Sequence, residues 1–213
     1  MYVIGLTGGI GSGKSTVAKL LEQHGASILS ADLVGHEVYA LGRPAWQDIV
    51  DAFGHDVVAE DGTIDRKKLG PIVFGDPENL ARLNSITHPR MKELMREKLD
   101  TLEGGGPRTA VLEAALLFDA GWDDLTDEVW VTVVPAEVAA KRTAERSGLA
   151  VEEVLRRIDA QMSNPERVER SDVVIDTDCS LDDTAKQVDE RWQDLQRRLK
   201  HETGPSTSLR TGY

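Results

Sequence analysis

A glycine-rich segment near the start of the chain constrains the fold more than any other feature. Residues 8–15 read GGIGSGKS, which matches the pattern G-x-x-x-x-G-K-[ST] of the phosphate-binding loop, or P-loop. An apolar run from Tyr2 to Leu6 precedes the loop, and helix-like apolar spacing follows it from Lys14 to Gln23. The pattern therefore lies between a predicted strand and a predicted helix, as its mechanism requires.

The residues of this loop suit a nucleoside triphosphate. The glycines let backbone N–H groups turn inward toward phosphates, and the N-terminus of the following helix adds a partial positive charge. Lys14 would reach the β- and γ-phosphates, and the Ser15 hydroxyl would be a ligand of Mg²⁺. The Thr16 hydroxyl either touches the α-phosphate or faces the first helical turn. The residues of the loop that we expect to bind ATP are Gly11, Ser12, Gly13, Lys14, Ser15 and Thr16.

Other apolar runs predict a parallel sheet. They cover residues 26–29, 110–112, 129–134 and 173–175 and lack polar alternation, which is typical of strands covered on both faces. Helical patterns cover residues 77–101, with a break or kink at His88-Pro89, and residues 136–147, 151–162 and 181–199. Residues 103–107 are predicted to form a loop. We therefore expect an α/β P-loop NTPase fold with three layers and a five-stranded parallel sheet.

A single domain of residues 1–202 is expected, in three parts. The core comprises residues 1–31, 104–140 and 169–202. Residues 32–103 hold no convincing strand and are predicted to be a helical insertion that binds the substrate. Residues 141–168 are predicted to form a helical lid, and residues 203–213, rich in Gly, Pro, Ser and Thr, a disordered tail.

Two acidic residues follow predicted strands. Asp32 comes just after residues 26–29, so it should lie at the carboxyl end of a strand beside the P-loop strand, at the edge where open α/β sheets bind ligands. A carboxylate there can accept the proton of an attacking hydroxyl or help to hold Mg²⁺. The alternative for Asp32 is an N-cap for the next helix. Glu113 ends another strand and is either a carboxylate behind the site or a surface residue.

Arginine is frequent between residues 142 and 170. Arg142 and Arg146 are four residues apart and so share one face of a predicted helix, and Arg157 and Gln161 repeat that spacing on the next helix. Such a helix pair can close over a triphosphate, where guanidinium groups neutralise the charge that develops on the transferred phosphoryl group. The alternative is a solvated helix pair whose glutamates balance the arginines.

The composition narrows the class of partner. The chain holds 25 basic and 37 acidic residues, a net charge of -12, which argues against nucleic acid or an anionic membrane as the main partner. A lone Cys179 and the absence of a secretory leader or a long apolar run favour a cytoplasmic protein. None of the three asparagines begins the Asn-Lys-x-Asp element of guanine-specific GTPases. A monomer is favoured, although the sequence does not fix the oligomeric state.

With these elements in order, the sequence resembles the dephospho-CoA kinases from Tyr2 to about Trp192. The most specific element is the extended P-loop IGLTGGIGSGKS at residues 4–15. The others are AD at 31–32, GTIDR at 62–66, VF at 73–74, LN at 83–84, HP at 88–89, LLF at 116–118, KRT at 141–143 with Arg146, RI at 157–158 with Gln161, and DVVID at 172–176.

The resemblance implies phosphorylation of the ribose 3′-hydroxyl of dephospho-CoA by ATP, the last step of coenzyme A synthesis. It implies a nucleotide core, a CoA-binding insertion and a lid. Within these, Asp32 would be the base, Lys14 and Ser15 would serve ATP and Mg²⁺, and His88 and Pro89 would belong to the substrate side. Taken alone, His88 beside a proline would be a helix-kink residue.

The lid residues follow the same resemblance, and a few positions depart from it. Arg142 and Arg146 would reach ATP from the lid, with Arg142 also catalytic. The family usually has Asp at Ser30, Pro at Ala115, Glu at Asp119 and Asn at Thr177. The loss of the carboxylate at residue 30 leaves Asp32 in place, whereas a Thr177 hydroxyl cannot copy the paired donor and acceptor of an amide.

Two other functions remain open from the residues alone. One is a P-loop kinase for a nucleoside or nucleotide, which a preference for a nucleoside monophosphate would reveal. The other is a nucleotide-dependent switch, which would hydrolyse ATP slowly and bind a protein partner in one nucleotide state.

Overall fold

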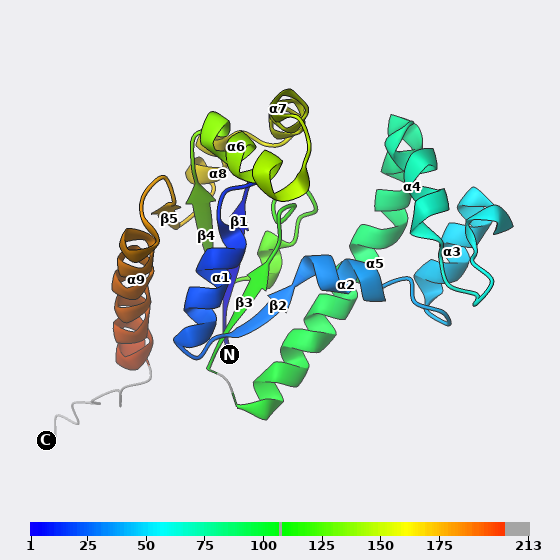
Figure 1. Cartoon of the computed structure of the whole chain (residues 1–213). Helices are drawn as coiled ribbons and strands as arrows, with labels where there is room; N and C mark the ends of the chain where they lie inside the picture. Colours follow the sequence, from blue (N-terminus) through cyan, green and yellow to red (C-terminus); the bar gives the residue numbers. More distant parts are fainter. Residues whose placement is uncertain (107, 203–213) are drawn as a thin grey trace, which may run out of the picture.

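Five short strands form one parallel sheet in the order β2-β3-β1-β4-β5 (Figure 1). The computed structural model describes residues 1–106 and 108–202, so the predicted disordered tail lies outside the described residues. The strands are β1 (Tyr2–Gly8), β2 (Ser27–Ser30), β3 (Thr109–Glu113), β4 (Glu128–Val133) and β5 (Val173–Asp176). The predicted five-stranded parallel sheet is confirmed.

One expectation about the sheet is wrong. The strand that precedes Asp32 is β2, and it does not lie beside the P-loop strand β1, because β3 lies between them. Val111 of β3 is opposite Ile4 on one side and Ile28 on the other. The first four residues of β3 are buried, whereas every residue of β2 is only partly buried, which suits β2 to the edge of the sheet.

Helices connect the strands and cover both faces of the sheet. They are α1 (Lys14–Gln23), α2 (Ala31–Glu37), α3 (Pro44–Phe53), α4 (Arg66–Phe74), α5 (Pro77–Gly105), α6 (Ala136–Ser147), α7 (Val151–Asp159), α8 (Asn164–Glu169) and α9 (Leu181–Glu202). Two 3₁₀ turns occur at η1 (His55–Val57) and η2 (Asp123–Leu125). None of the described helices is both long and apolar enough to cross a membrane.

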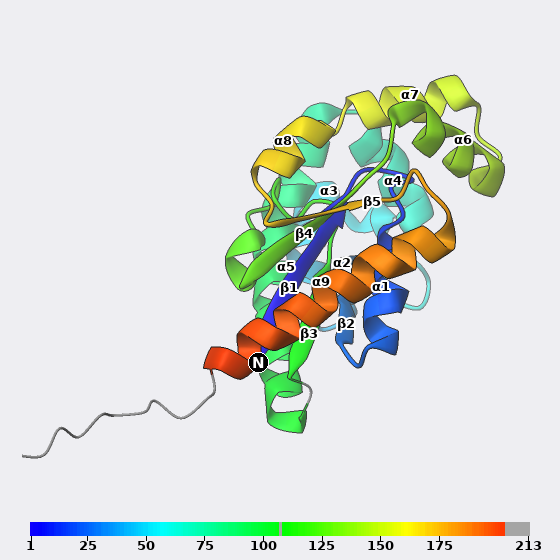
Figure 2. The same ribbon diagram turned by 90° about the vertical axis from the view of Figure 1, so that its left-hand side faces the viewer.

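Alternate residues of the central strand enter two different cores. Ile4 and Leu6 pack with Val17 of α1 and Leu195 of α9, while Val3 belongs to the core that α2 and α5 build on the opposite face. Figure 2 shows α1 and α9 in front of the sheet and α5 behind it. This strict alternation gives the three layers of the fold.

Helix α5 is longer and less interrupted than the sequence indicates. It runs without a break through His88-Pro89 and continues to Gly105, so it includes most of the loop expected at residues 103–107. Buried side chains on its C-terminal half, including Met91, Met95 and Leu99, pack against the sheet, and Leu83 and Ile86 pack against a separate small core. Packing on both sides of the proline outweighs the hydrogen bond that it removes.

Helices α3 and α4 form that small core away from the sheet, at the far end of α5 (Figure 1). Ile49, Val57, Leu69 and Val73 are buried there. Asp65 caps α4 by accepting hydrogen bonds from the N–H groups of residues 67 and 68. The segment between β2 and β3 therefore buries apolar side chains in a core to which no strand of the sheet contributes.

The segment after β4 holds a helix that the sequence pattern does not predict. Helix α7 ends at Asp159, three residues before the predicted end at Met162. A short helix, α8, follows, and Ser163 and Glu166 form a capping box at its start. Helices α6, α7 and α8 lie above the carboxyl end of the sheet (Figure 1).

Candidate active site

The P-loop joins β1 to α1, and two of its glycines hold conformations that other residues rarely adopt. Gly11 has a φ of 69° and Gly13 a φ of 84°. A Cβ at Gly11 would lie 2.5 Å from the carbonyl oxygen of Ala139 and 2.6 Å from Oγ1 of Thr143. Backbone strain and close contact with α6 therefore both require glycine at residue 11.

Side chains behind the loop hold its backbone in place. The Ser12 and Thr132 hydroxyls lie 2.7 Å apart in a buried hydrogen bond, and Thr177 Oγ1 donates to the carbonyl oxygen of Ser12 at 2.9 Å. The Ser12 hydroxyl is thus engaged behind the loop, and the backbone N–H of Ser12 donates to the carbonyl oxygen of Gly9 at 3.3 Å. Thr177 stands where the family that the sequence resembles usually has Asn. Its hydroxyl supports the P-loop through the hydrogen bond to Ser12.

Lys14 lies within the curve of the loop. Its Nζ donates to the carbonyl oxygens of Gly8 at 2.9 Å and Gly9 at 3.0 Å. Burial lowers the pKa of Lys14 to about 8, and the nearby Glu113 carboxylate opposes this effect only in part. Since a buried cation is costly without an anion, the site favours a negatively charged ligand.

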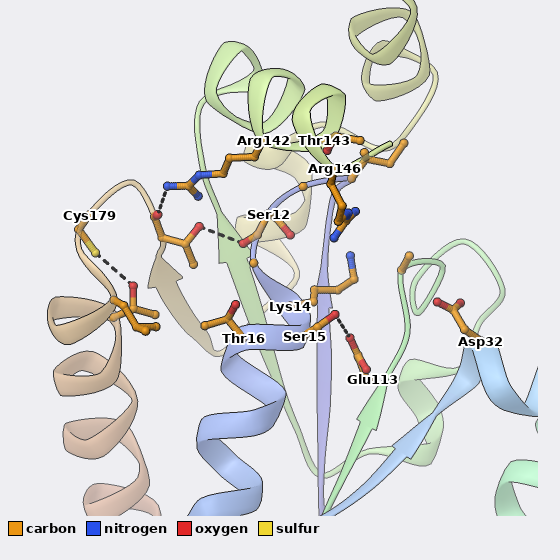
Figure 3. Close-up of a pocket in the computed structure, with 17 residues that line it drawn as sticks. Ser12, Lys14, Ser15, Thr16, Asp32, Glu113, Arg142, Thr143, Arg146 and Cys179 are labelled. Carbon is orange, nitrogen blue, oxygen red and sulfur yellow. Dashed lines mark hydrogen bonds between the residues drawn. The ribbon is translucent and has the colours of Figure 1, made fainter. Parts of the chain in front are cut away.

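A cleft of about 570 Å³ opens above the P-loop (Figure 3). The structure brings every predicted ATP-binding residue to it, namely Gly11, Ser12, Gly13, Lys14, Ser15, Thr16, Arg142 and Arg146. Asp32 and Glu113 line the same cleft, so it combines positive groups with two carboxylates.

Glu113 lies at the end of β3, inside the cleft. Its Oε1 accepts a hydrogen bond from the Ser15 hydroxyl at 3.2 Å. A hydroxyl beside a carboxylate is a donor set that suits Mg²⁺, which usually keeps one or two protein ligands and takes the rest from substrate phosphates and water. The residues around Ser15 therefore fit the metal, and Glu113, which is half-buried, is one of the residues that line the cleft.

The two predicted lid arginines reach the cleft from α6 in different ways (Figure 3). Arg142 extends toward β5 and donates from Nη2 to the carbonyl oxygen of Thr177 at 3.0 Å. Arg146 points down toward Lys14. Both arginines are exposed, so the solvent-facing side of the cleft carries two positive groups.

Asp32 lies within the first turn of α2 rather than at its cap. Ser30 occupies the N-cap position, so the capping alternative for Asp32 is wrong. The Asp32 side chain is exposed and lies across the cleft from Ser15 and Lys14 (Figure 3). A carboxylate in this place faces the region where the P-loop would hold the end of a triphosphate.

A second cleft, of about 520 Å³, meets the first at Asp32 and Ala115, which line both. Its other walls come mainly from α2, α4 and α5, with Leu116 and Trp122 from the segment after β3, and include Phe74, which is 80% exposed. Arg66 also lines it, with its guanidinium carbon 5.2 Å from the centre of the Tyr39 ring. The second cleft therefore offers apolar and cationic groups to an elongated ligand.

Of the two residues predicted for the substrate side, one lines this second cleft. His88 does so, with its ring 5.4 Å from that of Trp122, and burial lowers its pKa although Asp119 opposes the shift. Pro89 is exposed on α5 and is not among the residues that line the cleft. Its contact with a substrate stays a prediction.

Two further residues near the P-loop are not among the predicted site residues, although the sequence pairs Gln161 with Arg157 by helical spacing. Gln161 Oε1 accepts the backbone N–H of Ile10 at 3.0 Å. Arg167 is buried, with 3% of its surface exposed, and its charge helps to lower the pKa of Lys14. A basic residue amid many surface charges gives no sequence signal of burial, so only the structure shows its position.

The comparisons with known proteins agree with this geometry. The profile of the dephospho-CoA kinase family matches residues 2–183. A dephospho-CoA kinase from Carboxydothermus hydrogenoformans is 46% identical over 186 residues, which cover 87% of this chain and 90% of the relative. The chain belongs to the dephospho-CoA kinase family. Members of this family catalyse the final, ATP-dependent step of coenzyme A biosynthesis.

Solved structures support the same assignment and the P-loop NTPase fold. A Thermus thermophilus protein, TT1252, shares 34% identity with a TM-score of 0.76, over 93% of this chain and 97% of that one. A dephospho-CoA kinase from Campylobacter jejuni shares 27% identity with a TM-score of 0.70, over 92% and 98%. This dephospho-CoA kinase family member thus has the family's fold along nearly its whole length.

Proposed function

We propose that this chain transfers the γ-phosphoryl group of ATP to the ribose 3′-hydroxyl of dephospho-CoA, with Asp32 as the base. The observation that carries the proposal is that Asp32 lines both clefts, at the point where they meet. A group that accepts the proton of the attacking hydroxyl must reach both the hydroxyl and the phosphoryl donor. Asp32 holds that position.

The first cleft is the proposed ATP site. Backbone N–H groups of residues 11–16 and the ammonium group of Lys14 would bind the phosphates, and Arg142 and Arg146 would approach from the lid, residues 141–168. Arg142 and Lys14 would offset the charge that develops during transfer. The first cleft therefore supplies the positive field that the acidic chain as a whole lacks.

Magnesium is proposed to bind at Ser15, with Glu113 beside it. When bound, Mg²⁺ would draw negative charge from the β- and γ-phosphates. The protein's own part is to keep the Ser15 hydroxyl and the Glu113 carboxylate together at the foot of the cleft.

The second cleft is the proposed dephospho-CoA site. Residues 32–103, which supply α2, α4 and α5, would hold this substrate, with His88 in the wall and Pro89 beside it. The apolar surface suits the pantetheine arm, and Arg66 suits the diphosphate. A helical lid and a helical insertion would then enclose the two substrates from opposite sides.

The proposal extends to cellular context. A net charge of -12 disfavours nucleic acid and anionic membranes as partners. We propose a cytoplasmic enzyme that acts as a monomer on small molecules. Size-exclusion chromatography with light scattering checks the monomer.

An assay with ATP, Mg²⁺ and dephospho-CoA tests the activity. We expect formation of coenzyme A by the wild type and none above background by the Lys14→Ala variant. Nucleoside monophosphates serve as competing acceptors in the same assay. A preference for such an acceptor, or no turnover above the Lys14→Ala variant, would refute the proposed function.

A further inference from the structure

Arg167 is a buried arginine in a protein whose other arginines near the site are exposed. It lies on the short helix α8, and 3% of its surface is exposed. By contrast, both Arg142 and Arg146 are exposed on α6. A buried guanidinium group loses its hydration, so burial of this kind requires compensation by other groups.

Little in the protein compensates the charge of Arg167. Its Nη1 donates to the carbonyl oxygen of Met162. In the described ranges, 1–106 and 108–202, no carboxylate oxygen lies within 4.0 Å of its nitrogens, and Asp119 and Glu166 act on it only as charges at longer range. Its remaining N–H donors are available, and burial lowers its pKa.

Arg167 lies against the tip of the P-loop. A Cβ built on Gly9 would be 3.5 Å from Nη1 of Arg167 and 3.5 Å from Oε1 of Gln161. Gln161 in turn accepts the N–H of Ile10 at 3.0 Å, and the carbonyl oxygen of Gly9 accepts a hydrogen bond from Lys14. The guanidinium group is therefore fixed behind the part of the loop that Lys14 occupies.

This position corresponds to one end of the bound triphosphate. The lysine of a P-loop reaches the β- and γ-phosphates, and Lys14 already bonds Gly8 and Gly9 at that end. Gly9, which accepts a hydrogen bond from Lys14 at 3.0 Å, is also the residue whose Cβ would lie 3.5 Å from Nη1 of Arg167, so the two cations flank the same loop residue. Glu113 and Asp32 near Lys14, and Asp119 and Glu166 near Arg167, balance these two cations only in part, so an arriving terminal phosphate adds compensation.

We propose that Arg167 is a positioning residue that supplies a fixed positive charge behind the P-loop tip and stabilises the γ-phosphate end of bound ATP. The inference rests on the proposed ATP site and adds to it a cation outside the cleft lining. A fixed charge costs no reorganisation during the reaction, in contrast to the exposed arginines of α6. Its effect should therefore be larger on ATP than on ADP, which lacks the γ-phosphate.

Isothermal titration calorimetry of ATP and ADP, each with Mg²⁺ and without acceptor, tests the role of Arg167. In Arg167→Met we expect the Kd of ATP to rise roughly tenfold and that of ADP by less than about threefold. Arg167→Lys should keep most of the preference for ATP. The melting temperature of the ligand-free Arg167→Met variant should equal or exceed that of the wild type, because a buried and poorly compensated charge is removed.

Arg170→Met is the matched control. Arg170 lies three residues away, but its guanidinium carbon is 4.2 Å from the centre of the Phe118 ring, and it pairs with Asp123 at 3.6 Å. Its loss should leave the ratio of ATP to ADP affinity at the wild-type value. Arg167→Gln, which keeps a donor for the Met162 carbonyl, replaces Arg167→Met if that variant is unstable.

The results that would overturn the proposal are specific. If the wild type binds ATP and a neutral variant of Arg167 has an unchanged ratio of ATP to ADP affinity, the proposed role of Arg167 is overturned and the proposed function is not. Unfolding of both neutral variants would assign Arg167 a purely structural role and also overturn it. A wild type that binds neither nucleotide would overturn the proposed function and this inference together.

Discussion

The two clefts that meet at Asp32 differ in whether backbone or side chains form their walls. The ATP-side cleft rests on the backbone of one connection, the P-loop, whose conformation is held by glycines and by close contact with α6. The substrate-side cleft is formed by side chains from α2, α4 and α5 and from the segment after β3, among them His88 and the exposed Phe74. If the clefts bind the substrates as proposed, phosphate binding depends on backbone shape and acceptor binding on side-chain surface.

The largest effect should follow from a methyl group on the P-loop. Gly11→Ala would place a Cβ 2.5 Å from the Ala139 carbonyl oxygen at a φ of 69°. We expect turnover to fall by about 10³-fold or more, with ATP binding lost, because the phosphate cradle is displaced. Dephospho-CoA binding, measured by calorimetry, should persist.

Gly25→Ala is the control for backbone strain at Gly11. Gly25 has a φ of 94°, and a Cβ there meets nothing within 4 Å. It should cost about 1 kcal/mol of stability and leave turnover unchanged. Retained ATP binding in Gly11→Ala would contradict the view that backbone shape defines the first cleft.

A smaller effect is expected where the clefts meet. Asp32→Asn should lower turnover by roughly 10²-fold, since the amide cannot accept the proton of the hydroxyl. Both substrates should bind with wild-type affinity, because the chemistry and not either cleft is altered. Rapid-quench measurement of a single turnover checks the rate, and undiminished transfer would remove Asp32 from the mechanism.

The pH dependence of ligand affinity should also differ between the two clefts. The pKa of Lys14 is lowered to about 8 in the folded chain, against about 10.4 in an unfolded one. Between these values the unfolded chain binds the extra proton, so stability rises with pH while the cation that ATP needs is lost. ATP affinity should fall by up to about tenfold between pH 8 and pH 9.

Dephospho-CoA provides the comparison in the same titration. Its affinity should change much less over that interval, because Lys14 does not line the second cleft. In Lys14→Met the pH dependence of the remaining ATP binding should vanish. A dependence that survives in this variant would assign the titration to another group.

The smallest effect is expected at the mouth of the second cleft. Phe74→Ser removes an aromatic surface that is 80% exposed, so the stability of the free protein should hardly change. The KM for dephospho-CoA should rise by about three- to tenfold, through lost apolar contact, while the KM for ATP stays constant. Leu41→Ser, at a 59% exposed leucine outside both clefts, should change neither value.

The same contrast explains which parts of the site the sequence predicts. The P-loop is encoded in contiguous residues with a stereochemical requirement at Gly11 and Gly13, so the proposed ATP-binding residues follow from a short pattern. Asp32 is predicted because strand ends gather at one edge of a sheet. The sequence does not predict that β3 lies between β1 and the strand before Asp32, because strand order depends on long-range pairing.

Other features of the fold and the site are not predictable from the sequence and become visible only in the structure. His88-Pro89 reads as a break or kink, yet packing on both sides keeps α5 continuous. The glycines at 104 and 105 read as a loop, but α5 includes both. Arg167 resembles the other arginines of the predicted lid in sequence and differs from Arg142 and Arg146 in burial. Composition does not show which of several like charges a tertiary contact buries.

A structure of the chain with a non-hydrolysable ATP analogue and dephospho-CoA bound together tests the central claim most directly. We predict that the ribose 3′-oxygen lies about 2.6–3.2 Å from an Asp32 carboxylate oxygen and faces the γ-phosphate in line for transfer. The adenosine of dephospho-CoA should leave that point along the cleft that His88 lines. A 3′-hydroxyl held away from Asp32, or a second substrate bound outside that cleft, would contradict the account.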